Sequence, residues 1–150
     1  NENREDLELN SVWNAVKFEL RDAIHARNTV LECDELPVIK ADAENIYQLF
    51  YNLISNGVYH TTSEQPVVKL RYQFLNTEHR FEVHDNGMGI PAEYREKVFI
   101  IFQRLHNRDN YEGNGIGLDN CKKVVDYMRG KIWIEDSPLG GACFVCTIPA

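Results

Sequence analysis

The chain has 150 residues, of which 43% are hydrophobic and 26% are charged, a balance typical of a soluble globular protein. This length allows one domain whose core is large enough to fold without disulfide or metal crosslinks. The formal net charge is -7 and no block of Lys and Arg stands out, which argues against a surface for nucleic acid or an anionic membrane. No apolar run approaches the roughly 20 residues of a membrane span.

The four cysteines predict reduced, mostly buried thiols. No CxxC pair occurs, and Cys143 and Cys146 would lie on opposite faces of a strand. The spacing of a tetrahedral thiolate zinc site is missing. Reduced cysteines indicate a cytoplasmic protein. Because the chain starts at Asn1 and not at Met, we expect a fragment of a longer protein, in which a membrane segment could lie elsewhere.

The first third of the chain predicts two helices and a strand. Apolar residues recur at helical spacing from about 12 to 27, and Ser11 is a candidate N-cap. Residues 29–33 alternate like a strand. Asp42 is then the expected N-cap of a second helix, whose apolar face carries Ile46, Leu49, Phe50, Leu53 and Ile54.

The remainder predicts a hairpin, two helices and two closing strands. In chain order these are strands 67–74 and 80–83, a short helix at 93–99, a long helix at 118–128, and strands 131–135 and 142–148. Strands that are mostly hairpin partners, interspersed with helices, favour a two-layer α/β sandwich. We expect a mixed, mostly antiparallel sheet covered on one face by three helices.

The string NLISN on the second helix places Asn52 and Asn56 four residues apart, on one helix face. An amide oxygen is a neutral, hard ligand that suits Mg²⁺, which also binds substrate phosphates. The alternative is a pair of solvated or capping Asn residues.

The string HDNGMGIP ends a strand at Asp85, and Gly87 and Gly89 would let the backbone turn tightly beside a ligand. A partly buried Asp85 would accept a hydrogen bond from an exocyclic amine such as that of adenine. The alternative is a plain turn with a helix-capping Asp.

The string GNGIGL places Gly113, Gly115 and Gly117 before a helix, where backbone amides and the positive helix end suit phosphates. No strand feeds directly into it and GK[ST] is absent, so it is neither a dinucleotide fingerprint nor a P-loop. The alternative is a structural glycine hinge.

The order of these strings is more specific than any one of them. NLISN, HDNGMGIP, VFIIFQRL and GNGIGL resemble the N, G1, F and G2 boxes of the histidine kinase ATPase domain, the Bergerat fold of the GHKL superfamily. The resemblance runs from about residue 7 to 149, so we expect residues 1–150 to form one catalytic domain. FQRLH, CKKVVD and KIWIED are similar to kinases of the phytochrome type.

This resemblance implies ATP and Mg²⁺ as ligands. Asn56 would ligate Mg²⁺, Asn52 would lie beside the triphosphate, and Asp85 would bind the adenine amino group. Gly87 and Gly89 would make room for the base. The remaining implied ATP-binding residues are Tyr59, Ile90, Arg104, Gly113, Gly115, Ile116, Gly117 and Leu118. Residues 103–114 would form a mobile lid over the nucleotide.

The resemblance also implies partners. An external histidine, on the dimerisation and phosphoacceptor domain of the same protein, would attack the γ-phosphate, and a response regulator receiver domain would take the phosphoryl group next. None of the five histidines stands in a phosphoacceptor context. Phe99 and Phe102 match the F box, which packs near the lid and the phosphoacceptor helix, although both could simply be core residues.

Several positions depart from the family pattern. Tyr59 stands where a phosphate-contacting Lys is usual, Arg129 and Gly130 replace a usual Gly-Gly, and Leu139 replaces a common Gly. Tyr59 keeps open a second interpretation, a degenerate module that binds nucleotide or a partner without phosphotransfer. An anti-sigma-factor kinase or a chaperone-like ATPase is disfavoured, because Asn52 stands where such enzymes carry an acidic residue.

Overall fold

The computed structural model describes residues 4–59, 61, 64–95, 99 and 117–150. Its main sheet has five strands, and each pairs with its neighbours in the order β2, β4, β5, β7, β6. Only β2 and β4 pair in parallel among these strands, so the sheet is mixed and mostly antiparallel as expected. The strand bounds are Val30–Cys33 for β2, Val67–Leu75 for β4, Glu78–Asp85 for β5, Lys131–Asp136 for β6 and Ala142–Pro149 for β7.

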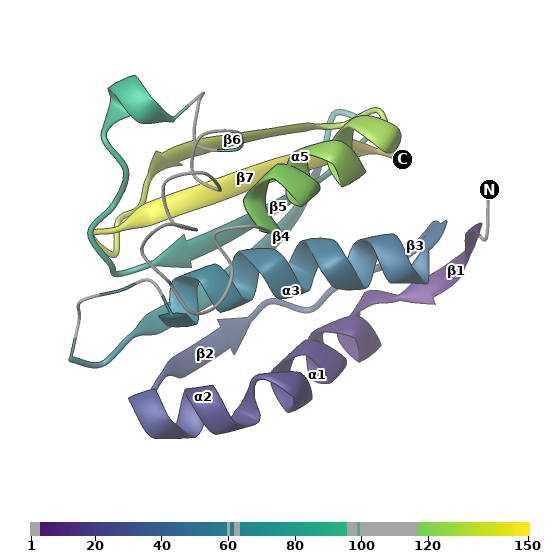
Figure 1. Ribbon diagram of the computed structural model, residues 1–150. Coiled ribbons are helices and arrows are strands. Elements are labelled where there is room, and N and C mark those ends of the chain that lie inside the picture. Colours follow the sequence, from purple (N-terminus) through teal and green to yellow (C-terminus); the bar gives the residue numbers. More distant parts are fainter. Residues whose placement is uncertain (1–3, 60, 62–63, 96–98, 100–116) are drawn as a thin grey trace.

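The helices lie on one side of this sheet (Figure 1), which confirms the expected two-layer α/β class. Helix α3 and helix α5 pack against each other and against the sheet, and α1 with α2 lies beside α3. The bounds are Leu9–Glu19 for α1, Arg21–Arg27 for α2, Ala43–Tyr59 for α3 and Gly117–Tyr127 for α5, with a 3₁₀ turn η1 at Ala92–Tyr94.

The single helix expected over 12–27 is two helices. The buried Leu20 between them has a non-helical backbone, with φ -94° and ψ 8°, so the chain changes course there. The predicted cap at Ser11 was also wrong. Helix α1 begins at Leu9, three residues before the expected start, and its N-cap Glu8 makes no side-chain capping bond. The expected cap at Asp42 is confirmed, because its Oδ1 accepts the amides of Glu44 at 2.9 Å and Asn45 at 3.3 Å.

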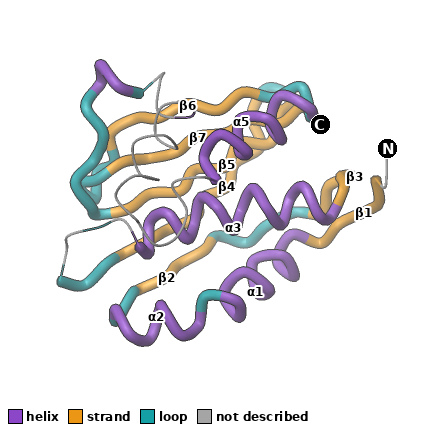
Figure 2. Tube along the Cα trace, in the orientation of Figure 1, coloured by secondary structure: helices purple, strands orange, loops and turns teal. Residues whose placement is uncertain are grey.

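A second, two-stranded sheet was not expected from the sequence. Strand β1 (Arg4–Glu8) pairs antiparallel with β3 (Val38–Asp42), apart from the main sheet (Figure 2). Strand β1 is polar and almost wholly exposed, so it lacks the alternation that reveals a half-buried strand. Its pairing is accompanied by an exposed ion pair between Lys40 and Asp6 at 3.2 Å.

The predicted hairpin is present as β4 and β5, and its inner face packs against the helices. Its turn residues Asn76 and Thr77 both have positive φ, 51° and 64°, the combination whose twist matches antiparallel strands. Along β5, Phe81 and Val83 face the helices, and the Phe81 ring meets that of Phe50 of α3 edge-on at 5.6 Å. Asp85 follows them on that inner face with the period of two of a strand.

No helix within the described ranges is long and apolar enough to cross a membrane.

Candidate functional site

Three polar side chains are buried where α3 crosses the end of β5. Asn52 and Asn56 of α3 are 5% and 7% exposed, and Asp85 of β5 is 7% exposed. Gly57 permits this approach, because a Cβ there would lie 2.9 Å from Cγ2 of Val68 and 3.5 Å from Cβ of Asp85. The helix and the strand therefore bring the first two motifs, NLISN and HDNGMGIP, close together.

The Asp85 carboxylate is held in a fixed orientation. Its Oδ1 accepts the backbone amides of Gly87 at 3.0 Å and Ala142 at 3.1 Å. Burial raises the pKa of this carboxyl, and those two hydrogen bonds partly offset the rise. An ionised carboxylate has about four acceptor positions, so two amides on one oxygen leave it able to accept a further donor.

Gly141 is a residue of this site that sequence reasoning missed. A Cβ at Gly141 would lie 2.2 Å from Asp85 Oδ1 and 2.5 Å from the Gly87 nitrogen, closer than any side chain permits. Its amide donates to the Asp85 carbonyl at 3.2 Å, which holds the β6–β7 turn against the end of β5. The signal in the sequence was the pair Gly140 and Gly141, which indicated only a turn between two strands.

The two asparagines differ in their surroundings. The Oδ1 atom of Asn56 is buried, and no described residue donates a hydrogen bond to it. The Asn52 side chain bonds to the Cys121 thiol of α5, where burial raises the thiol pKa and this bond opposes the rise. A buried acceptor without a donor costs roughly 1 to 3 kcal/mol. The Asn56 oxygen can therefore accept a bond from a ligand, and an amide oxygen suits Mg²⁺.

The segment after Asp85 turns as its glycines predict. Gly89 has φ +79°, a conformation that favours glycine, and it lies near the backbone of Gly141. Met88 between the two glycines is 76% exposed, whereas Ile90 packs partly against the core. The Met88 side chain therefore points into solvent, and the nucleotide roles of Gly87, Gly89 and Ile90 stay predictions.

The other predicted site residues are only partly placed. Gly117 is the first residue of α5, and the Leu118 side chain is buried in the core. Tyr59 packs partly against the core, with the Arg27 guanidinium 5.6 Å from its ring centre. The predictions for Arg104, Gly113, Gly115 and Ile116, for Phe102 and for a lid over 103–114 lie outside the described residues.

Phe99 of the F box is a core residue in this structure. Its side chain is buried, and its ring meets that of Phe144 of β7 edge-on at 6.2 Å. Packing against the sheet accounts for this position without a ligand, as the alternative interpretation allowed.

The sequence profile of one protein family matches residues 41–150, from the end of β3 to the last residue. The family is described as the histidine kinase-, DNA gyrase B-, and HSP90-like ATPases, and the chain belongs to it. Among curated relatives, cyanobacterial phytochrome A of Nostoc sp. is 41% identical over 130 residues, which cover 87% of this chain and 17% of the phytochrome. The adaptive-response sensory kinase SasA of the same organism is 34% identical over 134 residues, 87% of this chain and 33% of the kinase.

Solved structures agree with this assignment. The catalytic domain of histidine kinase ThkA is 29% identical, with a TM-score of 0.80 and 97% of each chain covered. ThkA in complex with the response regulator protein TrrA is similar with a TM-score of 0.77, 26% identity, and 97% and 41% coverage. The chain is homologous to the catalytic domains of sensor histidine kinases, and it spans about a sixth to a third of the length of the curated relatives above.

Proposed function

We propose that this domain binds ATP with Mg²⁺ and supplies the phosphoryl group in a two-component sensor histidine kinase. The observation that carries the proposal is the buried Asn56 oxygen, which has no donor among the described residues and lies on the helix that packs beside Asp85. A stable fold rarely buries an acceptor unpaired unless a ligand completes its bonding. The matched family and the kinase relatives support ATP as that ligand.

In this proposal Asp85 selects the base. Its carboxylate is oriented by the Gly87 and Ala142 amides and accepts the adenine amino group. Burial strengthens the bond, because the local dielectric is low and solvent reaches the carboxylate less easily. A guanine presents a carbonyl oxygen at the corresponding ring position, which the carboxylate would repel. The site should therefore prefer ATP to GTP.

Asn56 would hold the metal ion and Asn52 would stand beside the phosphates. Mg²⁺ bound to Asn56 Oδ1 would neutralise the charge of the triphosphate. Asn52 remains neutral and cannot take a proton from water. The domain would consequently favour transfer to a nucleophile brought from outside over hydrolysis of ATP.

The nucleophile in this proposal is a histidine on the dimerisation domain of a longer kinase, which the lengths of the relatives support. A response regulator receiver domain would then accept the phosphoryl group. The neighbour ThkA was solved with a response regulator protein, which favours a partner of this kind. We place the proposed reaction in the cytoplasm.

Tyr59 favours one second candidate, a module that binds nucleotide or a partner without phosphotransfer. The usual phosphate-contacting Lys is absent there, and the Tyr59 ring packs against the core and against the Arg27 guanidinium. Loss of a cation at this place would weaken the hold on the phosphates.

The test is a calorimetric titration of the domain with ATP and with GTP, each with and without Mg²⁺. We expect binding of ATP, strengthened by Mg²⁺, and at least tenfold weaker binding of GTP. An absence of binding at millimolar ATP would contradict the proposal. Radiolabelled phosphotransfer to the dimerisation domain of a kinase relative, supplied in trans, then separates the active kinase from the non-transferring module.

A further inference from the structure

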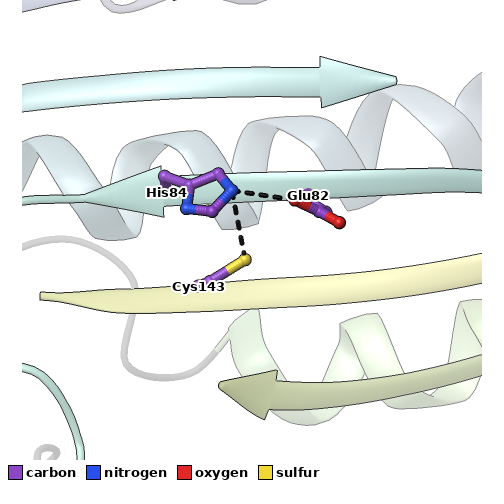
Figure 3. A group of neighbouring side chains, drawn as sticks. All are labelled: Glu82, His84 and Cys143. Carbon is purple, nitrogen blue, oxygen red and sulfur yellow. Dashed lines mark hydrogen bonds and ion pairs between the residues drawn. The ribbon is translucent and has the colours of Figure 1, made fainter. Parts of the chain in front are cut away.

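The outer face of the main sheet carries a cluster that the nucleotide site does not use. Among the described residues, Glu82 and His84 of β5 and Cys143 of β7 bring three possible metal-ligand atoms within 4.8 Å of one another (Figure 3). Sheet register creates the cluster, because His84 lies directly opposite Cys143. Glu82 precedes His84 by two residues and so shares its face.

The distances between these ligand atoms suit the tetrahedral coordination of a metal ion. The His84 Nε2 atom is 3.5 Å from Cys143 Sγ and 2.9 Å from Glu82 Oε1. Around tetrahedral zinc, the usual Zn–S, Zn–N and Zn–O bond lengths imply a sulfur–nitrogen separation of about 3.5 Å and a nitrogen–oxygen separation of about 3.3 Å. The thiol and the imidazole are already at that separation. The Glu82 oxygen, which is 2.9 Å from Nε2 and within 4.8 Å of Sγ, would move to complete the tetrahedron.

The two outward ligands are oriented by neighbours that bind their other atoms. His84 Nδ1 is 2.9 Å from the Ser137 hydroxyl, which directs Nε2 toward the cluster. Arg80 Nε donates to Glu82 Oε2 at 2.7 Å and leaves Oε1 to face His84. Metal-binding histidines and carboxylates usually have partners of this kind, because these fix the tautomer and the orientation of the ligand atom.

Access and charge also favour a cation. The His84 and Glu82 side chains are 13% and 23% exposed, so an ion can enter from the open face of the sheet. Glu135 lies opposite Cys143 on β6 and adds negative charge. The nearby cations are paired, Arg80 with Glu82 and Glu135, and Lys69 with Glu32.

We propose that Cys143 Sγ, His84 Nε2 and Glu82 Oε1 form a binding site for Zn²⁺, with water as the fourth ligand. One sulfur, one nitrogen and one oxygen ligand match the preferences of zinc better than those of Mg²⁺ or Ca²⁺. On binding, the Cys143 thiol releases its proton to solvent and the thiolate bonds to the ion, with no change of oxidation state.

The site would join β5 to β7 on the face opposite Asp85. His84 and Asp85 are consecutive in β5. Ser137, which orients His84, also donates its backbone amide to the Gly141 carbonyl at 3.0 Å. Zinc would therefore brace the turn that holds Asp85. Because the ion binds the folded chain, it should also raise the thermal midpoint of unfolding.

The test uses the 150-residue chain without nucleotide, since ATP itself chelates zinc. Titration with Zn²⁺ should show one site, and titration with Co²⁺ should give a near-ultraviolet thiolate-to-metal absorption band. Cys143→Ser should remove the band and weaken Zn²⁺ binding at least tenfold. The matched control is Cys33→Ser, because burial raises the pKa of both thiols to about 12 but only Cys143 has His84 and Glu82 beside it.

The proposal is overturned if the unaltered chain binds no Zn²⁺ at concentrations up to about 100 μM. It is also overturned if Cys143→Ser leaves the Co²⁺ band and the Zn²⁺ affinity unchanged. Should Cys143→Ser fail to fold, His84→Gln and Glu82→Gln provide the same comparison, since both side chains are partly exposed. Each should weaken Zn²⁺ binding several-fold, and an unchanged affinity in both would reject the site.

Discussion

The polar residues on the two faces of β5 differ in exposure and in hydrogen bonding. On the outer face, Glu82 and His84 are partly exposed and bound to Arg80 and Ser137. On the inner face, Asp85 and the neighbouring Asn56 are almost completely buried, and the Asn56 oxygen has no donor among the described residues. One strand thus separates a paired, solvent-facing layer from a buried site that is incompletely bonded.

This difference helps to recognise a candidate binding site in a structure that has no bound ligand. Partly exposed polar groups are common on an open sheet face, so their presence alone indicates no site. The zinc proposal depends instead on the spacing of the Glu82, His84 and Cys143 ligand atoms. A buried oxygen without a donor among the described residues lowers the stability of the fold. Thr29 Oγ1 is buried in the same way, so it is the position of Asn56 beside Asp85 that makes the Asn56 oxygen a candidate ligand atom. The comparison therefore favours the inner face for the proposed nucleotide site, and it predicts that substitutions on the two faces have different effects on ATP binding.

The largest effect on binding is expected for Asp85→Asn. The amide keeps an oxygen for the Gly87 and Ala142 amides but loses the charge, so ATP affinity should fall tenfold or more, from a loss of about 1.5 to 3 kcal/mol. Calorimetry with ATP measures this change. Glu32→Gln on the outer face is the control, because the partner of Glu32 among the described residues is Lys69 at a partly exposed site, and the ATP affinity should not change. Equal affinity for ATP in both variants would remove Asp85 from the site.

The next effect is on stability and binding together, at Gly141. In Gly141→Ala the new Cβ would overlap Asp85 Oδ1 and the Gly87 nitrogen, so the β6–β7 turn must shift. We expect a loss of about 1 to 3 kcal/mol in the free energy of unfolding and weaker ATP binding. Denaturant unfolding and calorimetry test the two parts, with Pro138→Ala, an exposed change in the same turn, as the control. A Gly141→Ala domain as stable as the unaltered one would mean that the turn does not brace Asp85.

Asn56→Ala should separate function from stability. The substitution removes a buried acceptor that has no described donor, so the thermal midpoint should fall less than in Gly141→Ala. The strengthening of ATP binding by Mg²⁺ should disappear, as measured by titrations with and without the ion. Gln48→Ala on the same helix should keep that response. If Asn56→Ala still responds to Mg²⁺, another group holds the ion.

The smallest effect, a modest loss of stability, is expected for a substitution at the N-terminal end of α3. Asp42→Ala removes the cap that accepts the amides of Glu44 and Asn45, which should lower the free energy of unfolding by about 1 kcal/mol. ATP affinity should not change under conditions where the domain stays folded. Asp6→Ala, which removes only an exposed ion pair, should have less effect on stability. Reduced ATP affinity in folded Asp42→Ala would show that binding depends on helix stability and not on the buried residues alone.

Much of the fold followed from local patterns in the sequence. The apolar face and the cap of α3, the β4–β5 hairpin and the two closing strands were predicted because periodicity, capping and turn residues act over a few neighbouring positions. Strand β1 was missed because four of its five residues are polar and exposed, and because it is a strand through its pairing with β3. The break at Leu20 was missed because both helices continue the same apolar spacing.

The sequence by itself determined the family and the order of its motifs, since Asn52, Asn56 and Asp85 stand in short strings whose chemistry can be recognised. Only the tertiary structure decided that Gly141 packs on Asp85, that the Asn56 oxygen is buried without a described donor, and that His84 faces Cys143. The physical reason is that these relations depend on strand register and on helix–sheet packing. Both join residues that are far apart in the chain, and local sequence patterns do not specify which distant partners meet.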